Sequence, residues 1–325
     1  MARSSAFKTC VLVLLVLGWV GISSADPIRI GYPTWVGFGP IYLAKEKGFF
    51  KTQGVDVDIQ VIEDTKLGMA ALAANRIDMY GVTPNTLLLY VKPDARFVMV
   101  MVGDGSAGGV GIVARKEITS IAALKGKRVA FLEGSVAQFY LNYLLKKEGL
   151  SEKDVSPLNM TTGDAGAAFV AGRVDAAVVW EPWLSKGKSA PHGHLLIDSR
   201  QTPGIIVDTL AFRADVVQTR REDVRKVIRG VNQAVAFWKS NPKEANEIMA
   251  KGLGGWLKEP KDFEEALSGA KLYDVADNRQ LMGSAQQPGP FYQTVREAIE
   301  FWRSSGKLVW PDVKPQDIID PSLLQ

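Results

Sequence analysis

Hydrophobic and polar residues follow two different periods along most of the chain. Short runs of β-branched and apolar residues alternate with longer stretches in which apolar residues recur every three or four positions. The runs predict strands and the stretches predict helices, an alternation typical of α/β proteins with parallel sheets covered by helices on both faces. The predicted strands are Ile28–Tyr32, Val55–Ile62, Ile77–Val82, Phe97–Val102, Gly109–Ala114, Arg128–Leu132, Val155–Met160 and Val174–Trp180.

Predicted helices separate these strands and then dominate the end of the chain. From Arg221 onward the pattern is nearly all helical. Pro242, Pro260 and Pro290 stand at helix starts, where the N–H that proline lacks would have no helical partner. The predicted helices are Pro40–Lys47, Leu67–Ala74, Pro84–Val91, Ser135–Glu148, Asp164–Ala171, Arg221–Lys239, Pro242–Lys251, Pro260–Ala270 and Pro290–Arg303.

One stretch of sequence occurs twice. Residues 70–78, "AALAANRID", are similar to residues 167–175, "AAFVAGRVD", at an offset of 97. Each copy reads as an Ala-rich helix, a turn at Asn or Gly, which tolerate the left-handed conformation, and Arg–aliphatic–Asp before a strand. A second match, "AKEKG" at 44–48 and "LKKEG" at 145–149, lies upstream of each copy. Two matches in the same order predict two similar lobes of about 100 residues with a cleft between them.

The first 25 residues read as a secretory signal peptide. Arg3 and Lys8 precede an apolar run, Val11–Ile22, that is too short to span a bilayer, and Ser23–Ala25 has the small residues of a cleavage site. The only cysteine, Cys10, lies in this segment, so the mature chain is expected to have no disulfide, thiolate nucleophile or cysteine-bound metal. We therefore expect a periplasmic protein.

Composition and charge exclude several classes of function. The chain is 46% hydrophobic and 23% charged, which is typical of a folded globular protein. Without Arg3 and Lys8, the 39 basic residues become 37, against 35 acidic ones. A charge this small, with no basic stripe, argues against a nucleic-acid partner.

Two local patterns suggest cofactors or metals, and neither is convincing. Residues 103–108, "GDGSAG", match G-x-G-x-x-G, but a strand rather than a helix follows, so a crossover hinge is favoured over a dinucleotide site. His192 and His194 could ligate a metal, but a surface turn is favoured. We expect no catalytic residue, no metal and no cofactor.

Ligands of α/β sheets bind beyond the carboxyl ends of the strands, so the loops that follow predicted strands are the candidate site. Four such loops, at 33–40, 83–86, 133–136 and 180–183, combine Pro or Gly with hydroxyl, amide or aromatic groups, which suits a small molecule. The expected ligand-binding residues, drawn from these loops and from the crossovers, are Thr34, Trp35, Asn85, Asp104, Ser106, Ser135, Glu181, Trp183 and Asp208.

Three segments resemble a known family. Residues 28–50, "IRIGYPTWVGFGPIYLAKEKGFF", are similar to the start of the mature substrate-binding proteins of the nitrate/taurine/sulfonate class of ABC importers. Residues 120–129, "SIAALKGKRV", followed by "EGSVAQFYL", resemble the start of their second lobe. Residues 159–183, "NMTTGDAGAAFVAGRVDAAVVWEPW", resemble their most recognisable segment, and the similarity covers nearly all of residues 26–255.

The resemblance implies a periplasmic binding protein of type II, with two Rossmann-like lobes, a hinge and a helical C-terminal extension. Lobe I is expected to contain 26–104 and 209–325, and lobe II 105–208. The implied partners are a small solute and the permease and ATPase subunits of an ABC importer at the inner membrane, and the protein itself is expected to be a monomer. The class covers nitrate, bicarbonate, taurine, alkanesulfonates and pyrimidine vitamin precursors, so the resemblance does not identify the solute.

One relative implied by the resemblance is an enzyme, the fungal-type pyrimidine synthase, which consumes its own histidine and needs a cysteine-rich iron segment. The matching region here has no such histidine, and the mature chain has no cysteine. A transcriptional regulator of the same fold would carry a helix-turn-helix segment instead of a signal peptide. The sequence therefore favours a binding protein over an enzyme or a regulator.

The candidate residues suggest the charge of the solute. Trp35 and Trp183 are expected to form an apolar or cation–π wall. Asn85 and Ser135 begin helices, where an N–H and a side chain can together hold an acceptor. Glu181 and Asp208 would oppose a simple anion, so we expect a cationic or amino-bearing solute such as a guanidine, an amidine, an amino-sulfonate or an aminopyrimidine. The alternative is an alkanesulfonate or nitrate, with the carboxylates paired to arginines.

Overall fold

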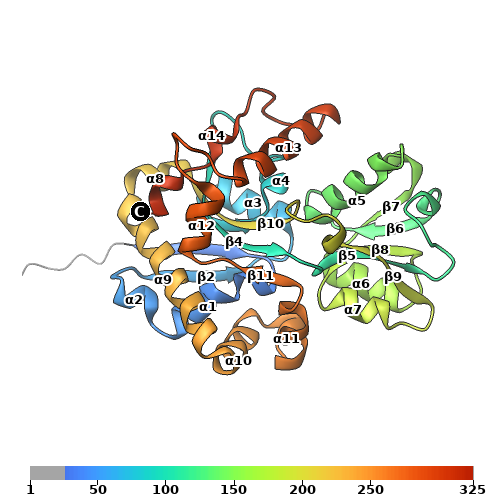
Figure 1. The fold of residues 1–325 in the computed structure, drawn as a ribbon, viewed down its shortest axis with the longest axis horizontal. Helices are drawn as coiled ribbons and strands as arrows, with labels where there is room; N and C mark the ends of the chain where they lie inside the picture. The colour runs from blue at the N-terminus through green and yellow to red at the C-terminus, as the bar shows by residue number, and fades with distance from the viewer. Residues whose placement is uncertain (1–25, 325) are drawn as a thin grey trace, which may run out of the picture.

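The computed structural model describes residues 26–324, so the predicted signal peptide lies outside the described residues. The strands form two separate sheets, which stand side by side in Figure 1. The first sheet contains, in spatial order, β11 (Ala270–Leu272), β4 (Phe97–Ser106), β10 (Val207–Arg213), β3 (Met79–Val82), β1 (Ile28–Tyr32) and β2 (Val57–Val61). The second contains β7 (Ser156–Asn159), β6 (Arg128–Phe131), β8 (Ala176–Trp180), β5 (Val110–Arg115) and β9 (Gly193–Asp198).

The two sheets share one core arrangement. In the first, β1 lies between β2 and β3, both parallel to it, and β10 follows antiparallel to β3. In the second, β6 lies between β7 and β8, both parallel to it, and β5 follows antiparallel to β8. The expectation of two similar α/β lobes is therefore confirmed. The expectation of wholly parallel sheets is wrong, because β10 and β11 in the first sheet and β5 in the second run opposite to the other strands.

Helices cover both faces of each sheet (Figure 1). The C-terminal part of the chain, drawn in orange and red, returns to the first sheet and is mostly helical as expected, although the short strand β11 interrupts it. Among residues 26–324, none of the helices has the length and apolar character that crossing a membrane requires. The α-helices are α1 (Gly39–Glu46), α2 (Phe49–Thr52), α3 (Thr65–Ala73), α4 (Pro84–Leu87), α5 (Val136–Lys147), α6 (Thr162–Val170), α7 (Trp183–Lys188), α8 (Ala214–Thr219), α9 (Arg221–Ser240), α10 (Pro242–Leu253), α11 (Pro260–Leu267), α12 (Val275–Met282), α13 (Phe291–Ser304) and α14 (Pro315–Ile318).

The repeated sequence forms the same local structure in both lobes. Asn75 and Gly172, the turn residues of the two copies, have positive φ angles of 59° and 72°. The aspartate that ends each copy then binds an arginine of the neighbouring strand. Asp78 accepts hydrogen bonds from the backbone N–H, Nε and Nη2 of Arg29 at 2.7–3.0 Å. Asp175 accepts the same three from Arg128 at 2.9–3.2 Å. The repeat therefore marks equivalent positions of two homologous sheets.

Two segments connect the sheets. β4 leads into β5 through Gly108, which has a φ of 115°, and the strand continuation expected after the Gly-rich segment 103–108 is present. The chain returns from β9 through a short 3₁₀ helix, Ser199–Gln201, to β10. The predicted lobe boundaries, 104/105 and 208/209, fall inside β4 and β10, both of which belong to the first sheet. Away from these crossovers, Phe139 of α5 packs edge-on against Phe301 of α13, with ring centroids 5.0 Å apart.

Candidate functional site

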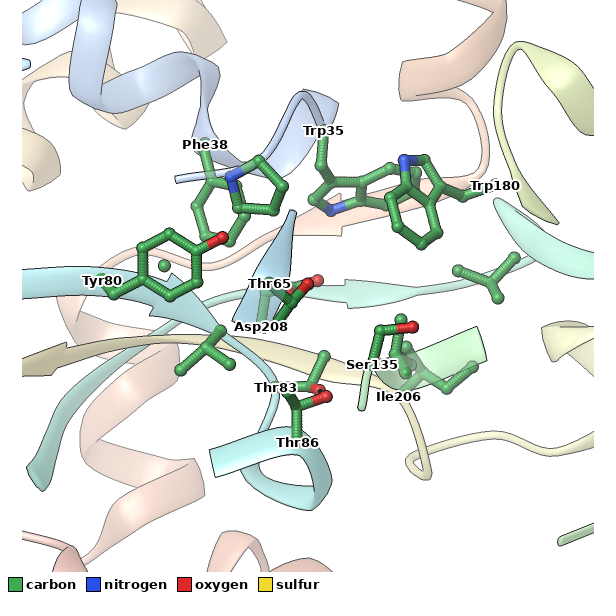
Figure 2. Close-up of a pocket in the computed structure, with 15 residues that line it drawn as sticks. Trp35, Phe38, Thr65, Tyr80, Thr83, Thr86, Ser135, Trp180, Ile206 and Asp208 are labelled. Carbon is green, nitrogen blue, oxygen red and sulfur yellow. Dashed lines mark hydrogen bonds between the residues drawn. The ribbon is translucent and has the colours of Figure 1, made fainter. Parts of the chain in front are cut away.

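A small cavity of about 40 Å³ lies between the two sheets, at the carboxyl ends of β1, β3 and β8. Figure 2 shows its walls, with two indoles on one side and a group of hydroxyls on the other. Residues of both sheets contribute, as the expected cleft requires. The lining residues are Pro33, Trp35, Phe38, Thr65, Tyr80, Gly81, Val82, Thr83, Thr86, Val110, Ser135, Val136, Trp180, Ile206 and Asp208.

The indole wall joins the two lobes. Trp35 follows β1 and Trp180 ends β8, and their rings lie side by side over the cavity (Figure 2). The indole N–H of Trp180 donates a 3.1 Å hydrogen bond to the backbone carbonyl of Thr34, which directly links the two lobes. Thr34 in turn donates from its hydroxyl to the carboxylate of Glu63, whose pKa is raised mainly by burial. The cavity wall therefore includes a polar contact that opening of the lobes would break.

The other indole is held by a buried carboxylate. The Nε1–H of Trp35 donates to Asp104 Oδ1 at 3.0 Å, and Asp104 has no exposed surface. The second oxygen, Oδ2, has no hydrogen-bond partner among the described residues. Asp104 comes this close because residue 37 is glycine: a Cβ there would lie 1.7 Å from Oδ2. Gly37 and Asp104 together set the position of the Trp35 ring.

Asp208 brings a second carboxylate to the cavity. It lies directly across the β4–β10 pair from Asp104, and it lines the cavity floor (Figure 2). Burial raises the pKa of Asp104 to about 7, even though its hydrogen bond from Trp35 acts in the opposite direction. The pKa of Asp208 is also well above its usual value, first because of burial and then because of the charge of Asp104. Neither acid forms an ion pair with a Lys, Arg or His in residues 26–324.

Hydroxyl groups cover the opposite wall. Thr83 and Thr86 stand at the start of α4, where the Thr83 hydroxyl donates to Asn85 Oδ1 at 2.6 Å. From the second lobe, Ser135 caps α5: its Oγ accepts from the backbone N–H of Ala137 at 3.1 Å and donates to the carbonyl of Leu132. These groups offer donors and acceptors of no net charge.

The structure brings only some of the expected ligand-binding residues to this cavity. Trp35, Ser135 and Asp208 line it. Thr34, Asn85 and Asp104 are buried directly behind the wall, in contact with residues that line it. The other three expected residues lie elsewhere: Ser106, Glu181 and Trp183.

Ser106 and Trp183 have neighbours of their own. The Ser106 hydroxyl lies 2.8 Å from the Ser199 hydroxyl in the crossover region. Trp183 begins α7, where it packs against the core of the second sheet, with Lys186 Nζ 5.0 Å from its ring centroid. The cation on the Trp183 ring thus comes from the protein's own α7.

Glu181 contributes to a second cavity of about 190 Å³, next to Gly108 and Gly269 near the crossovers. Its carboxylate accepts hydrogen bonds from the backbone N–H and the hydroxyl of Ser185, at 3.0 and 2.9 Å. Burial raises its pKa, and these hydrogen bonds partly offset the increase. Lys188 and Arg200 line this cavity together with Asp198 and Glu265, so it contains charges of both signs, unlike the first cavity.

Several lining residues were missed by the sequence analysis. Phe38 and Thr86 lie in loops that were selected, and Trp180 immediately precedes Glu181, so an aromatic count in these loops would have found two of them. Tyr80 gave no signal because it lies within a buried strand; the residue lines the cavity, and its hydroxyl donates a 2.9 Å hydrogen bond to the carbonyl of Ile62. Ile206, just before β10, came from a segment with no predicted element.

Known binding proteins are similar to this chain in sequence. The chain is 28% identical over 256 residues to a binding protein of Brucella abortus (strain 2308), covering 77% of this chain and 79% of that protein. It is 23% identical over 272 residues to the taurine-binding periplasmic protein of Escherichia coli (strain K12), covering 80% and 81%.

Solved structures share the fold. The alkanesulfonate-binding protein SsuA from Xanthomonas axonopodis pv. citri, bound to MOPS, aligns with a TM-score of 0.73 at 22% identity, over 90% of this chain and 99% of that one. A desulfurization enzyme, DSZB, aligns with a TM-score of 0.63 at 15% identity, over 91% and 97%. The periplasmic-binding-protein fold of type II is therefore confirmed, although the fold alone does not separate binding proteins from enzymes.

A family model described as "NMT1/THI5 like" matches residues 35–245, a region that includes the whole second sheet, four strands of the first and every residue lining the cavity except Pro33. This is well over half of the chain. The resemblance to the nitrate/taurine/sulfonate class of ABC-importer binding proteins is confirmed, and the chain belongs to the NMT1/THI5-like family.

Proposed function

We propose that this protein is the periplasmic solute-binding component of an ABC importer, and that it captures a small cationic or amino-bearing nitrogenous solute in the cavity between its lobes. One observation carries the charge preference: Asp208 lines the cavity with Asp104 behind it, and no Lys, Arg or His is among the lining residues. A bound anion would meet like charge without a counter-ion, whereas a donor or a cation would find an acceptor.

The aromatic walls fit the same kind of solute. Trp35, Trp180, Tyr80 and Phe38 surround the cavity, so a flat or compact cation gains both apolar contact and cation–π attraction, about 0.5–2 kcal/mol for each well-placed ring. The hydroxyls of Thr83, Thr86 and Ser135 can bond the remaining polar groups. An amino-sulfonate also satisfies these contacts, which agrees with the names of the sulfonate- and taurine-binding relatives.

Capture requires the lobes to move. A cavity of about 40 Å³ is large enough for a few waters, yet small-molecule sites usually measure about 300–1,000 Å³. A solute would therefore enter while the lobes are apart, and closure would restore contacts such as that between Trp180 and Thr34. Small-angle scattering of the protein at saturating ligand should show a decrease in the radius of gyration, and unchanged curves would contradict hinge closure.

The proposed ligand contacts are Trp35, Ser135 and Asp208, to which we add Tyr80, Thr83 and Trp180. Thr34, Asn85 and Asp104 position these residues through their hydrogen bonds. Ser106, Glu181 and Trp183 act outside this cavity. The remaining parts of the proposal follow the similarity to binding proteins. The protein would be exported through a cleaved signal peptide and act as a monomer. It would deliver the solute, chemically unchanged, to a permease and its ATPase.

The test is a thermal-unfolding screen of the purified mature chain. The panel contains acetamidine, guanidine, 4-aminopyrimidine, taurine, ethanesulfonate and nitrate, in buffers free of sulfonates. A ligand present at 100 times its Kd stabilises the folded state by about 2.7 kcal/mol, and we expect such shifts with the nitrogenous cations or taurine. Shifts with ethanesulfonate or nitrate alone would replace the proposed solute class with the alternative. The ligand recovered after prolonged incubation should be unchanged, because turnover would indicate an enzyme.

A further inference from the structure

The acidic floor of the cavity has a geometry that carries an inference beyond general charge preference. Asp104 and Asp208 are direct partners in the antiparallel pair of β4 and β10. Side chains of such partners lie on the same face of a sheet, with Cβ atoms about 4.5–5.5 Å apart. Two ionised carboxylates at this distance repel each other, and the repulsion is strong where water is excluded.

Few groups around this pair could reduce the repulsion between the two carboxylates. Asp104 has no exposed surface, and Asp208 is 9% exposed. The groups packed around them are the Trp35 indole and the Gly37 backbone from the loop after β1, and the Tyr273 hydroxyl from the segment after β11. Asp277 of α12 adds negative charge beside Tyr273, and the exposed Lys271 lies over the ring of Tyr273, with its Nζ 5.2 Å from the centroid.

The remaining titratable groups of the cavity wall are also acidic or phenolic. Tyr80 of β3 lines the cavity, and burial raises its pKa, with a further contribution from Glu63. The carboxylate of Glu63 already accepts hydrogen bonds from the backbone N–H and the hydroxyl of Thr34. No cationic side chain within residues 26–324 contributes to the pKa shift of either aspartate.

One atom of the pair lacks a partner. Asp104 Oδ1 accepts from Trp35, but the fully buried Oδ2 has no hydrogen-bond partner among the described residues. A buried acceptor without a donor costs about 1–3 kcal/mol, and an ionised one costs more. A proton carried by the pair would remove the repulsion, and Oδ2, which has no hydrogen-bond partner among the described residues, is an oxygen that can carry it. The direction of the pKa values, raised for both acids, agrees with this geometry.

We propose that Asp104 and Asp208 share one proton when the cavity is empty, and that a bound solute replaces this proton with a hydrogen-bond donor of its own. The proton passes to the solvent, and the pair keeps its second negative charge only while the donor is present. This inference rests on the proposed function and specifies it: the pair is the specificity-determining element, selecting ammonium, amidinium or aminopyrimidine groups over sulfonates and nitrate.

The pair would select between solutes through the free energy of its second ionisation. A solute that donates two hydrogen bonds, or carries a positive charge, compensates the second ionisation of the pair. An anion keeps the shared proton in place and finds no donor from a charged side chain. Binding of a cation should therefore tighten as the pH rises toward neutrality, because fewer protons have to be displaced.

The first experiment needs no ligand. Carbon-detected NMR of the mature chain, labelled at the aspartate carboxyl carbons, follows each resonance from pH 3 to pH 9. We expect one aspartate to titrate above pH 6 in the wild type, to move to lower pH in Asp208→Asn, and to be lost in Asp104→Asn. Asp58→Asn, on the exposed side of β2, is the matched control and should leave that titration unchanged. Ordinary titration of every aspartate below pH 5 in the wild type would overturn the proposal even if both variants failed to fold.

The second experiment measures proton release with benzamidinium as the probe and benzenesulfonate as its anionic counterpart. Calorimetry at pH 6.5 in two sulfonate-free buffers of different ionisation enthalpy should show release of roughly 0.5–1 proton per bound benzamidinium. Its affinity should rise about tenfold from pH 5.5 to pH 7.5, and Asp104→Asn should abolish both effects. Binding without proton release, or tighter binding of benzenesulfonate, would overturn the proposal. If the thermal screen finds no ligand at all, the proposed function fails, while the NMR titration still decides whether the proton is shared.

Discussion

Two pairs of aspartates in this protein have opposite surroundings. Asp78 and Asp175 lie at equivalent positions of the two sheets, and each accepts three hydrogen bonds from an arginine of the adjacent strand. Asp104 and Asp208 lie next to each other in one sheet and have no arginine at all. The pKa of Asp175 is lowered, chiefly by the hydrogen bonds of Arg128, whereas burial raises the pKa of Asp104 to about 7.

The contrast separates structural from functional acids. An aspartate whose acceptor sites are filled by a guanidinium stays ionised and has no capacity left for a ligand. An aspartate that is buried without a cation is costly for folding, and it persists where a ligand supplies the missing donor. Four measurements test this distinction.

The largest effect is expected on stability at the first sheet. Asp78→Ala removes the acceptor of Arg29 and of Arg213, which lies 3.2 Å from the same carboxylate with 11% of its side chain exposed. Arg29 would lose its ion-pair partner and Arg213 would keep only the exposed Asp215, so the free energy of unfolding should decrease by about 3 kcal/mol. Urea unfolding at pH 7.5 would show a lower midpoint with an unchanged slope.

Asp175→Ala is the matched comparison in the second sheet. Asp175 pairs with Arg128 and Arg115, whose side chains are 50% and 28% exposed, so water can replace the lost partner more readily than at Arg213 and the decrease in midpoint should be smaller. Equal losses in the two variants would show that burial of the arginine does not govern these bonds.

The next effect concerns stability and pH. The pKa of Asp104, about 7, exceeds the ordinary value of 3.8 that applies in the unfolded chain. A raised pKa means that the folded state binds the proton more tightly, so this contribution is fully present below pH 4 and is lost as the pH rises toward 7. Relative to Asp104→Asn, the wild type should lose about 2 kcal/mol between pH 5 and pH 7.5. Parallel stability curves for the two proteins would contradict this assignment.

A smaller effect is expected on affinity at the cavity. Asp208→Asn keeps the shape of the side chain but removes its charge, and a charge-assisted hydrogen bond contributes about 1.5–3 kcal/mol. Benzamidinium should therefore bind at least tenfold more weakly at pH 8, measured by calorimetry against the wild type. Asp58→Asn serves as the surface control, and an unchanged affinity in Asp208→Asn would remove the aspartate from the site.

The smallest effect is expected at the second cavity. The carboxylate of Glu181 accepts two hydrogen bonds from Ser185, and Glu181 does not line the first cavity. Glu181→Gln should therefore change the affinity for benzamidinium by less than twofold. A larger loss would mean that the solute reaches the second cavity, and the acidic site would have to be extended toward the crossovers.

Much of the fold could be predicted because local patterns determine it. The strand Ile28–Tyr32 has the predicted bounds, and the helices α5, α9 and α13 differ from their predicted ranges by only one residue at either end. The repeat at 70–78 and 167–175 identified equivalent positions, and the structure shows why: both aspartates need the same arginine bond. Strand direction was less predictable, since β5 and β10 run opposite to β8 and β3, and these pairings join segments far apart in sequence.

The site was harder to predict than the fold. Trp35 and Ser135 could be predicted because they lie in Gly- and Pro-containing loops after strands. Glu181 was selected for its position between two tryptophans, but the sequence does not show that Ser185, one helical turn later, satisfies it. Tyr80 is a strand residue with the pattern of a core, and only the meeting of two sheets places it at a cavity. Trp180 lies in a selected loop, but its neighbours Glu181 and Trp183 were chosen instead.

The contact between Trp180 and Thr34 also makes the protein its own optical reporter. The two indoles that meet over the cavity, Trp35 and Trp180, come from different lobes, so separation of the lobes would expose both rings and break one hydrogen bond. Their emission would then change with occupancy, without any attached dye. Excitation of the native chain during titration provides a reagentless assay, and Trp180→Phe would remove the half of the signal that belongs to the second lobe.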